Sequence, residues 1–430
     1  MKFYSTNNKK LLVSLREAVT KGLAPDGGLY MPEEIKPLPS NFLSGLDKLS
    51  NAEMAGYITS HLIGEDVPEN VIHQLVADTV SFEVPLIQLA DRIWSLELFH
   101  GPTLAFKDFG ARFMASLLGY FAQAEGDQFT ILVATSGDTG SAVAHGFHNV
   151  PGIKVIVLYP SGKVSDLQEK QFTTLGDNIT AIEVDGTFDD CQRLVKAAFG
   201  DKHLREQLNL TSANSINIAR LIPQSFYYFF SHARMPKSRP LVFSVPSGNF
   251  GNLTGGIFAQ RMGLPIHHFV AATNSNDVVP QYLKTQTFEA RPSVQTISNA
   301  MDVGDPSNFA RLLDLFNHEY KLFVKEITGF AFNDDQTRST MKEVFLRTGY
   351  MLDPHGAVGY LGLTKYLDVN KEANGIFLET AHPGKFKEVV EAVLDKKVIL
   401  PERLSKLQHK EKKSIKMTKS FTDFREYLIG

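Results

Sequence analysis

The stretch FTILVATSGDTGSAVAHG, from Phe129 to Gly146, joins an apolar run to a loop of small residues and then to a segment with helical spacing. The run from Phe129 to Ala134 is almost entirely apolar, which is typical of a strand buried on both faces of a parallel sheet. Strand, loop and helix in this order indicate a βαβ unit, in which ligands bind where loops leave the carboxyl ends of strands. The stretch therefore predicts an α/β fold with a ligand site in this loop.

Four further runs rich in Val, Ile and Phe end abruptly in polar or glycine-rich loops. They are Lys154 to Leu158, Leu241 to Val245, His268 to Ala272 and Gly375 to Leu378. Segments with helical spacing lie between such runs, for example Leu253 to Met262. Strands that alternate with helices in this way predict a largely parallel sheet covered by helices on both sides.

The 430 residues are enough for two domains of typical size and an appendage. The first 90 residues are mostly helical in pattern and contain proline-rich breaks, so we expect a separate cap there. A second division is expected at MPKSRP, residues 235–240. The lysine-rich stretch 409–419 is expected to be a solvated helix or tail. The predicted regions are 1–90 (cap), 91–238 and 239–400 (two α/β regions) and 401–430 (C-terminal extension).

Composition limits the class of partner. Hydrophobic residues make up 43% of the chain and charged residues 21%, which is typical of a soluble globular protein. The formal net charge of −3 gives no basic surface for nucleic acid or an anionic membrane. With one cysteine, Cys191, the chain has no internal disulfide, and because MKFYSTNNKK, residues 1–10, contains no apolar run we expect no targeting leader. We expect a cytoplasmic protein that acts on a small molecule.

The segment LFHGPTLAFKDFG, from Leu98 to Gly110, places Lys107 between two phenylalanines just before a helix. A partly apolar site favours the neutral form of a lysine, which then serves as a nucleophile or holds the aldehyde of pyridoxal 5′-phosphate (PLP). The alternative is a surface lysine at a helix start, with Asp108 as its N-terminal cap. This segment alone favours the alternative.

Two glycine-rich loops each follow a predicted strand and open a helix. ATSGDTGSAVAHG, from Ala134 to Gly146, is a candidate clamp for a carboxylate or phosphate, or a turn needed only for chain geometry. SVPSGNFGNLTGG, from Ser244 to Gly256, could offer consecutive backbone donors around a phosphate. It lacks the lysine and hydroxyl of a P-loop, so a nucleotide triphosphatase is disfavoured.

Together the three loops supply an aldehyde anchor, a carboxylate clamp and a phosphate cradle, as an enzyme that acts on an amino acid through PLP requires. Histidine-based metal catalysis is a weaker alternative. His145 with His148, or His267 with His268, could share a metal, but no supporting ligand pattern accompanies them. We expect no catalytic metal.

Sequence motifs distributed over nearly the whole chain carry a resemblance to one family. They are YSTN (4–7), GLAPDGGLYMP (22–32), HGPTLAFKD (100–108), ATSGDTG (134–140), LQEKQ (167–171), NSINIAR (214–220), SNAMDVGDPSN (298–308) and ETAHPGKF (379–386). With these motifs the chain closely resembles the threonine synthases of the bacterial and fungal type, a family of fold-type II PLP enzymes. The resemblance implies two α/β/α domains, as in the tryptophan synthase β subunit, and a mainly helical N-terminal cap.

The same resemblance implies an activity. The substrates would be O-phospho-L-homoserine and water, and the products L-threonine and phosphate, formed by γ-elimination and β-addition of water as the final step of threonine biosynthesis. Lys107 would hold PLP as a Schiff base and then move protons. The sequence leaves open whether the protein is a monomer or a homodimer. Alternatives are a serine or threonine dehydratase-like lyase of the same fold and a non-catalytic ligand-binding protein.

The resemblance also implies roles for individual residues. Residues expected at the cofactor are Lys107, Gly248, Asn249, Phe250, Gly251, Asn252, Thr380 and Asp138. Residues expected at the substrate carboxylate are Ser136, Gly137, Thr139 and Gly140, and those expected at the substrate phosphate are Asn214, Ser215 and Arg220. For Arg220 the alternative is a surface salt bridge. Asp138 departs from the asparagine that is usual in this fold type, which leaves its role open.

Overall fold

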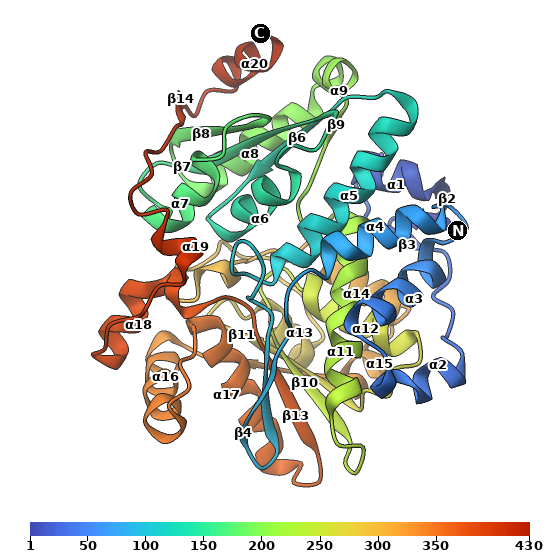
Figure 1. Cartoon of the computed structure of the whole chain (residues 1–430), viewed down its shortest axis with the longest axis vertical. Coiled ribbons are helices and arrows are strands. Elements are labelled where there is room, and N and C mark those ends of the chain that lie inside the picture. The colour runs from blue at the N-terminus through green and yellow to red at the C-terminus, as the bar shows by residue number, and fades with distance from the viewer.

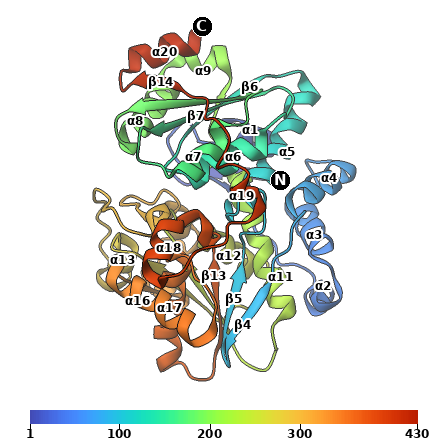
Figure 2. The same ribbon diagram turned by 60° about the vertical axis from the view of Figure 1, so that its left-hand side comes forward.

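The computed structural model describes residues 1–430, apart from the side chain of Glu206. Two larger sheets form the centres of two lobes, one above the other in Figure 2, and the N-terminal helices lie beside them. The chain passes between the lobes several times, and its C-terminus lies at the far end of the upper lobe (Figure 1).

The sheet of the upper lobe is parallel throughout. Its strands are β6 (Phe129–Ala134), β7 (Ile153–Pro160), β8 (Ile179–Asp185), β9 (Leu210–Thr211) and β14 (Ile415–Thr418), in the order β14-β8-β7-β6-β9. Successive side chains of a strand point to opposite faces. In β6, Ile131 and Val133 therefore enter one core, and Leu132 and Ala134 enter another. Burial on both faces explains the apolar run in the sequence.

Helices cover both faces of this sheet. On one face lie α5 (Lys107–Glu125), α6 (Asp138–Phe147) and α7 (Asp166–Thr173), and on the other lie α8 (Phe188–Gly200), α9 (Lys202–Leu208) and α20 (Phe421–Ile429). Phe113 of α5 and Phe147 of α6 are buried in the core that contains Ile131. Leu194 of α8 and Phe424 of α20 are buried in the core that contains Leu132.

The sheet of the lower lobe has six strands. They are β4 (Leu86–Ala90), β5 (Ile93–Glu97), β10 (Leu241–Pro246), β11 (His268–Thr273), β12 (Ile327–Ala331) and β13 (Asn374–Glu379), in the order β12-β11-β10-β13-β5-β4. All neighbours are parallel except β4, which pairs with β5 in the antiparallel sense. The five apolar runs identified in the sequence are confirmed as β6, β7, β10, β11 and β13.

Helices also cover both faces of the six-stranded sheet. One face carries α11 (Phe226–Arg234), α12 (Gly251–Arg261) and α13 (Val278–Thr285), and the other carries α16 (Asp334–Thr348), α17 (Pro354–Val369) and α18 (Lys387–Leu394). Phe243 and Phe269 point to the first group, and Val242 and Val270 point to the second. Both lobes thus have the helix–sheet–helix layering of an α/β protein.

The N-terminal region contains strands that the sequence analysis did not predict. β1 (Lys2–Ser5) pairs in the antiparallel sense with β2 (Asn8–Ser14) and β3 (Tyr30–Pro32). The region is otherwise helical, with α1 (Leu15–Lys21), α2 (Ser40–Ser44), the 3₁₀ turn η1 (Leu46–Lys48), α3 (Asn51–Ile63) and α4 (Glu69–Thr79). Ser50 and Glu53 form a capping box at the start of α3.

The C-terminal segment corrects one prediction. Residues 409–419 were expected to form a solvated helix or tail, but Ile415–Thr418 forms β14 and pairs with β8. The lysines misled the prediction because edge strands, too, carry exposed lysines. The remaining elements are α10 (Ile218–Leu221), α14 (Phe309–Leu315), α15 (Tyr320–Glu326), α19 (Glu402–Ser405) and the 3₁₀ turns η2 (Ile222–Ser225), η3 (Asn299–Met301) and η4 (Pro383–Phe386).

The strand pairing suggests how to divide the chain into domains. The region 91–238 supplies strands to both sheets, since β5 lies in the six-stranded sheet. The C-terminal β14 joins the sheet of residues 129–211. We propose that the sheets define the two α/β units, so that residues 86–97 group with 241–379, and residues 415–430 group with 129–211.

Candidate active site

The loops predicted to bind ligands leave the carboxyl ends of neighbouring strands. β10 and β13 are adjacent and parallel, so the loop after Pro246 and the segment after Glu379 start from the same edge of the sheet. Ala105 forms an antiparallel bridge with Ala381, and the Phe106 N–H donates to the Thr380 carbonyl at 2.8 Å. This pairing brings the Lys107 loop to the same edge.

Lys107 is the first residue of α5 and is partly buried. The alternative of a surface lysine capped by Asp108 is wrong, because the Asp108 side chain is buried and turns back to the preceding loop. Its Oδ1 accepts from the Thr103 hydroxyl at 2.7 Å, and its Oδ2 accepts from the Thr103 N–H at 2.9 Å. These bonds fix the loop that carries Lys107.

The surroundings of Lys107 favour its neutral form. Burial lowers the pKa of Lys107 to about 8, the nearby carboxylate of Asp138 opposes this, and the cations Arg220 and Lys385 add to it. A lowered pKa of this kind is typical of lysines that act as nucleophiles or bases.

The loop from Gly248 to Asn252 presents a row of unpaired donors. The backbone N–H groups of these five residues have no acceptor among the described residues, and they lead into the N-terminus of α12. Phe250 has a φ of +59°, which turns the chain at this point. The side chain of Asn252 folds back to the Pro246 carbonyl at 2.8 Å and accepts from the Ser247 hydroxyl at 3.0 Å. Such a rigid nest of N–H groups suits a phosphate.

Gly248 lies tightly against a neighbouring segment. A Cβ atom added there would come within 2.6 Å of the Met301 Cα, so the loop has no room for a side chain. The position of Met301 is fixed in turn because His355 Nε2 accepts from the Ala300 N–H at 3.2 Å. The shape of the donor loop therefore depends on η3 and on α17.

The loop after β6 is organised by Thr135, which the sequence analysis missed. Its hydroxyl oxygen accepts from the N–H groups of Gly137, at 2.9 Å, and Gly140, at 2.8 Å. Gly137 has a φ of +142°, which favours glycine, and a Cβ atom there would collide with the Gln168 side chain at 2.8 Å. The N–H groups of Ser136, Asp138 and Thr139 have no acceptor among the described residues, as an anion clamp requires.

Asp138 is buried at the start of α6 and is bound on one oxygen. Its Oδ1 lies 2.7 Å from Lys385 Nζ and accepts from Gln168 Nε2 at 2.9 Å. Burial alone would raise the pKa of Asp138, but Lys385 and then Lys107 outweigh it and hold the pKa well below its usual range. Asp138 is therefore an anion paired with a lysine that the sequence analysis did not single out as a site residue.

Arg220 is buried rather than part of a surface salt bridge, so that alternative is wrong. Its guanidinium donates to the Ala213 carbonyl through Nη1, and its Nε is buried without a partner among the described residues. A Cβ atom on Gly110 would lie 2.8 Å from this Nε. Because residues three apart share a helix face, Arg220 lies close to Lys107. A buried cation with an unused donor is suited to an anionic ligand.

Asn214 and Ser215 lie on the partly buried segment that precedes α10. The Ser215 hydroxyl accepts from Asn249 Nδ2, which links this segment to the loop of unpaired donors. Arg311, fully buried on α14, donates to the carbonyls of Ser215 at 3.4 Å and Ile216 at 2.7 Å. The Asn249–Ser215 bond thus couples the two predicted phosphate sites, and Arg311, which no motif in the sequence indicated, holds the Ser215 side of this link.

Thr380 is buried directly after β13, and its hydroxyl has no partner among the described residues. The structure thus brings the predicted site residues together around the edges of both sheets. Thr135, Gln168, Lys385 and Arg311 were missed. Gln168 and Lys385 lie in motifs that carried the family resemblance, and a hydroxyl at the end of a strand was the signal for Thr135.

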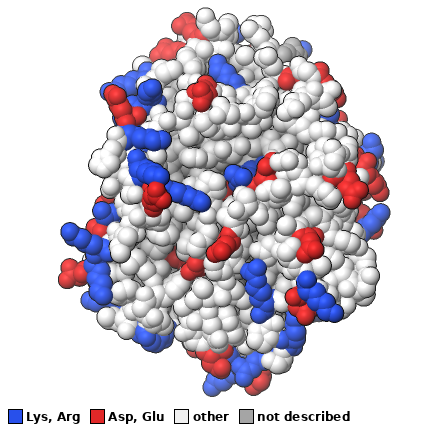
Figure 3. Space-filling view, viewed as in Figure 1, with Lys and Arg blue, Asp and Glu red and all other residues white. Residues whose placement is uncertain are grey.

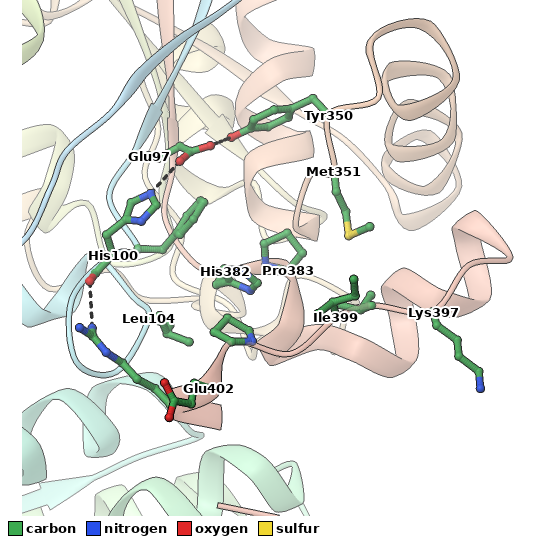
Figure 4. Close-up of a pocket in the computed structure, with 14 residues that line it drawn as sticks. Glu97, His100, Leu104, Tyr350, Met351, His382, Pro383, Lys397, Ile399 and Glu402 are labelled. Carbon is green, nitrogen blue, oxygen red and sulfur yellow. Dashed lines mark hydrogen bonds and ion pairs between the residues drawn. The ribbon is translucent and has the colours of Figure 1, made fainter. Parts of the chain in front are cut away.

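A cavity of about 720 Å³ lies next to the Lys107 loop and is shown in Figure 4. Glu97 on its wall accepts from the Tyr350 hydroxyl at 2.8 Å and contacts His100 at 2.7 Å. Leu104 and His382 connect it to the loops described above. Because none of the predicted site residues lines this cavity, we assign it no part in the site.

Two of the histidines considered as metal ligands have other side-chain partners. His148 pairs with Asp177 at 2.9 Å, and His268 bonds to the Thr328 hydroxyl at 2.8 Å. Burial lowers the pKa of His145 to about 4. Among the side chains that the structure describes, no three His, Cys, Asp or Glu residues are grouped to hold a metal ion.

Two observations concern larger partners. On the face shown in Figure 3, acidic and basic side chains lie among one another. None of the described helices combines the length and the apolar content needed to cross a membrane.

The site has the features that PLP needs: an amine of lowered pKa, a nest of five unpaired N–H groups and a free hydroxyl at the end of a strand. Residues 78–376 match the family model described as pyridoxal-phosphate dependent enzyme. Fold and site thus define a PLP-dependent enzyme of fold type II.

Both ends of the chain specify the family further. Residues 2–80 match the model of the threonine synthase N terminus, and residues 356–428 match that of the threonine synthase C-terminal region. A threonine synthase from Serratia marcescens is 44% identical over 436 residues, which cover 100% of this chain and 99% of that protein. The chain belongs to the threonine synthase family.

Solved structures agree. The crystal structure of threonine synthase from Escherichia coli has a TM-score of 0.93 and 43% identity, and it covers 100% of this chain and 99% of its own. PLP-bound threonine synthase from Brucella melitensis has a TM-score of 0.93 and 33% identity, with 100% and 98% covered. The predicted fold class and the PLP cofactor are confirmed.

Proposed function

We propose that this chain converts O-phospho-L-homoserine and water to L-threonine and phosphate. The observation that carries the proposal is a pair of anion sites beside Lys107. One is the nest from Gly248 to Asn252, and the other is the buried Arg220 with its unused Nε. A dehydratase would need the first site but has no phosphorylated substrate to occupy the second.

The nest would hold the cofactor phosphate, and the Thr380 hydroxyl would face the pyridine nitrogen. When bound, PLP supplies an electron sink for carbanions next to the substrate amine. The unpaired N–H groups of Ser136 and Thr139 would hold the substrate carboxylate. Asn214, Ser215 and Arg220 would hold the substrate phosphate and stabilise the charge that develops as it leaves.

Lys107 would act as the proton carrier. Its pKa of about 8 leaves part of the amine neutral near pH 7.5, so that it can remove the Cα proton and later return a proton to the same carbon. Water must reach Cβ only after phosphate has left. The buried positions of Arg220 and Thr380 limit the access of water to the reacting atoms.

The proposal is tested by incubating the purified protein with PLP and O-phospho-L-homoserine while both products are measured. We expect threonine and phosphate in equal amounts. Phosphate without threonine, or ammonia with a keto acid, would contradict the proposal and favour the dehydratase-like alternative. A protein that binds the substrate but forms no product would favour the non-catalytic alternative.

Arg220→Lys provides a further comparison because it keeps the charge but loses the planar fork. We expect the KM for O-phospho-L-homoserine to rise roughly tenfold or more, since a charge-assisted bond contributes about 1.5–3 kcal/mol. Cofactor absorbance should stay unchanged, because the nest holds PLP. An unchanged KM would remove Arg220 from the substrate site.

A further inference from the structure

Lys385 joins three loops of the site. It lies in η4 and is fully buried, and its Nζ contacts Asp138 Oδ1 at 2.7 Å and donates to the Thr103 carbonyl at 2.8 Å. Asp138 opens α6 of the upper lobe, whereas Lys385 follows β13 of the lower lobe. Thr103 belongs to the loop that Asp108 fixes in front of Lys107. One ammonium group thus ties both lobes to the lysine loop.

Burying two charges costs solvation energy, and a well-packed apolar pair is often as stable. Stability alone therefore does not explain why this ion pair is buried here. The charged groups that act on Lys107 are Asp138 from α6, Arg220 from α10 and Lys385 from η4. Asp138 is the anion among them, and it is the group that would hold Lys107 in its charged, unreactive form if it were free.

We propose that Lys385 is a positioning residue that engages the Asp138 carboxylate and the Thr103 carbonyl, and so favours the neutral amine of Lys107. The inference rests on the proposed role of Lys107 as the cofactor anchor. Lys385 does not touch the reacting atoms but acts mainly through Asp138, whose second anchor is Gln168, and its own charge adds a smaller direct effect on Lys107. This also gives Asp138 a role. Its carboxylate, paired with Lys385 and bonded to Gln168, fixes the end of the loop that would clamp the substrate.

The electrostatics agree with this geometry. The pKa of Asp138 is held well below its usual range, with Lys385 the larger of the two cationic contributions. The pKa of Lys107 falls to about 8 even though Asp138 is close. Lys385 also acts on His145, whose pKa burial lowers to about 4, so this histidine is neutral near pH 7.

The test measures how fast the full-length apoprotein captures PLP. The neutral Lys107 amine condenses with the cofactor aldehyde and water is lost, so the rate of growth of the visible absorbance follows the neutral fraction of Lys107. Measured at saturating PLP from pH 7 to pH 9.5, it gives a midpoint for Lys107. In Lys385→Gln we expect the midpoint to rise by about half a unit or more, and capture at pH 7.5 to slow about threefold.

Two controls accompany this variant. Lys387→Gln removes a lysine two residues away that lies 3.9 Å from Glu391 at the surface, and its midpoint should equal that of the wild type. Lys385→Arg keeps the charge, and its midpoint should lie close to that of the wild type. If Lys385→Gln folds and keeps the wild-type midpoint, the proposal is overturned. If the wild type itself gives no visible band, the anchor role of Lys107 fails instead.

Lys385→Gln leaves the Asp138 carboxylate buried without its lysine and could be too unstable to purify. A second pair of variants, in which Asp138 is replaced by an uncharged residue, tests the proposal in that case. Asp138→Asn is compared with Asp138→Asn/Lys385→Gln. Because Lys385 acts mainly through Asp138, its removal should shift the midpoint by less than about half a unit in this background. A shift of about half a unit or more would show that Lys385 acts on Lys107 mainly by its own charge, and would overturn the proposal.

Discussion

At the scale of single residues, the site depends on glycines that leave no room for a side chain and on ionisable groups that are buried away from water. Gly137 combines a φ of +142° with close contact to Gln168. Glu379 is completely buried, and its Oε2 has no partner among the described residues. The sequence predicted Gly137 because glycines mark loops that approach ligands. Glu379 gave no such signal, since its burial depends on packing against α17.

Gly137→Ala should damage the clamp for the substrate carboxylate. Strain at this φ and the collision with Gln168 should lower the free energy of unfolding by about 1–3 kcal/mol. Displacement of the loop should lower kcat/KM roughly tenfold to a hundredfold. Gly162→Ala is the control, because Gly162 has a φ of +66° but no neighbour within 4 Å. Equal kinetic losses in both variants would contradict the assignment.

Glu379→Gln should change how stability depends on pH. Burial, followed by the charge of Asp353, raises the pKa of Glu379 well above its usual range, so the folded protein keeps a proton that the unfolded chain releases. Stability contributed by this group is present below the unfolded pKa and is lost as the pH rises. Relative to the wild type, the variant should therefore gain stability in urea unfolding as the pH goes from 5 to 8. A difference that does not depend on pH would contradict the buried, protonated carboxyl.

At the scale of elements, the sequence predicted the buried strands, which are apolar runs, and the glycine-rich loops that follow them. The strands β6, β10 and β13 were predictable because burial on both faces demands apolar side chains at nearly every position. β14 was not, because a four-residue edge strand whose residues are mostly exposed resembles a loop. Lys385 and Arg311 were missed for another reason: a single buried cation has no sequence pattern, and its partners come from distant segments.

Gly248→Ala tests the cofactor cradle as an element. The added Cβ would come within 2.6 Å of the Met301 Cα, and backbone cannot give way as a flexible side chain does. Displacement of the nest should weaken PLP binding about tenfold or more, since several charge-assisted bonds are lost. PLP affinity is measured by titrating the apoprotein and following the visible absorbance. Gly56→Ala, on α3 with open space around it, should bind PLP as the wild type does. Unchanged affinity in Gly248→Ala would place the cofactor phosphate elsewhere.

At the scale of the whole molecule, the chain returns at its C-terminus to the sheet it built in its first half. β14 extends that sheet beside β8, and Phe424 and Leu428 of α20 are buried in the core that contains Cys191 and Leu194. The sequence predicted two α/β units but not this return, because contacts between residues more than 200 positions apart leave no local pattern. The Lys385–Asp138 pair also connects the two lobes.

Phe424→Ala should reveal how much the C-terminal return contributes to stability. Phe424 is fully buried, and truncating a buried phenylalanine costs about 3–5 kcal/mol. Ile429→Ala, on the same helix but 41% exposed, should change the free energy of unfolding by less than about 1 kcal/mol. Denaturant unfolding of both variants checks this. If the two variants unfold alike, the C-terminal helix is not part of the core.

The central claim is that Lys107, among all lysines of the chain, holds the cofactor. It is tested most directly by reducing the PLP-loaded protein with borohydride, digesting it and locating the modified lysine by mass spectrometry. We predict a single modified peptide in which the cofactor is attached to Lys107. Attachment to Lys385 or to any other lysine in place of Lys107 would contradict the account.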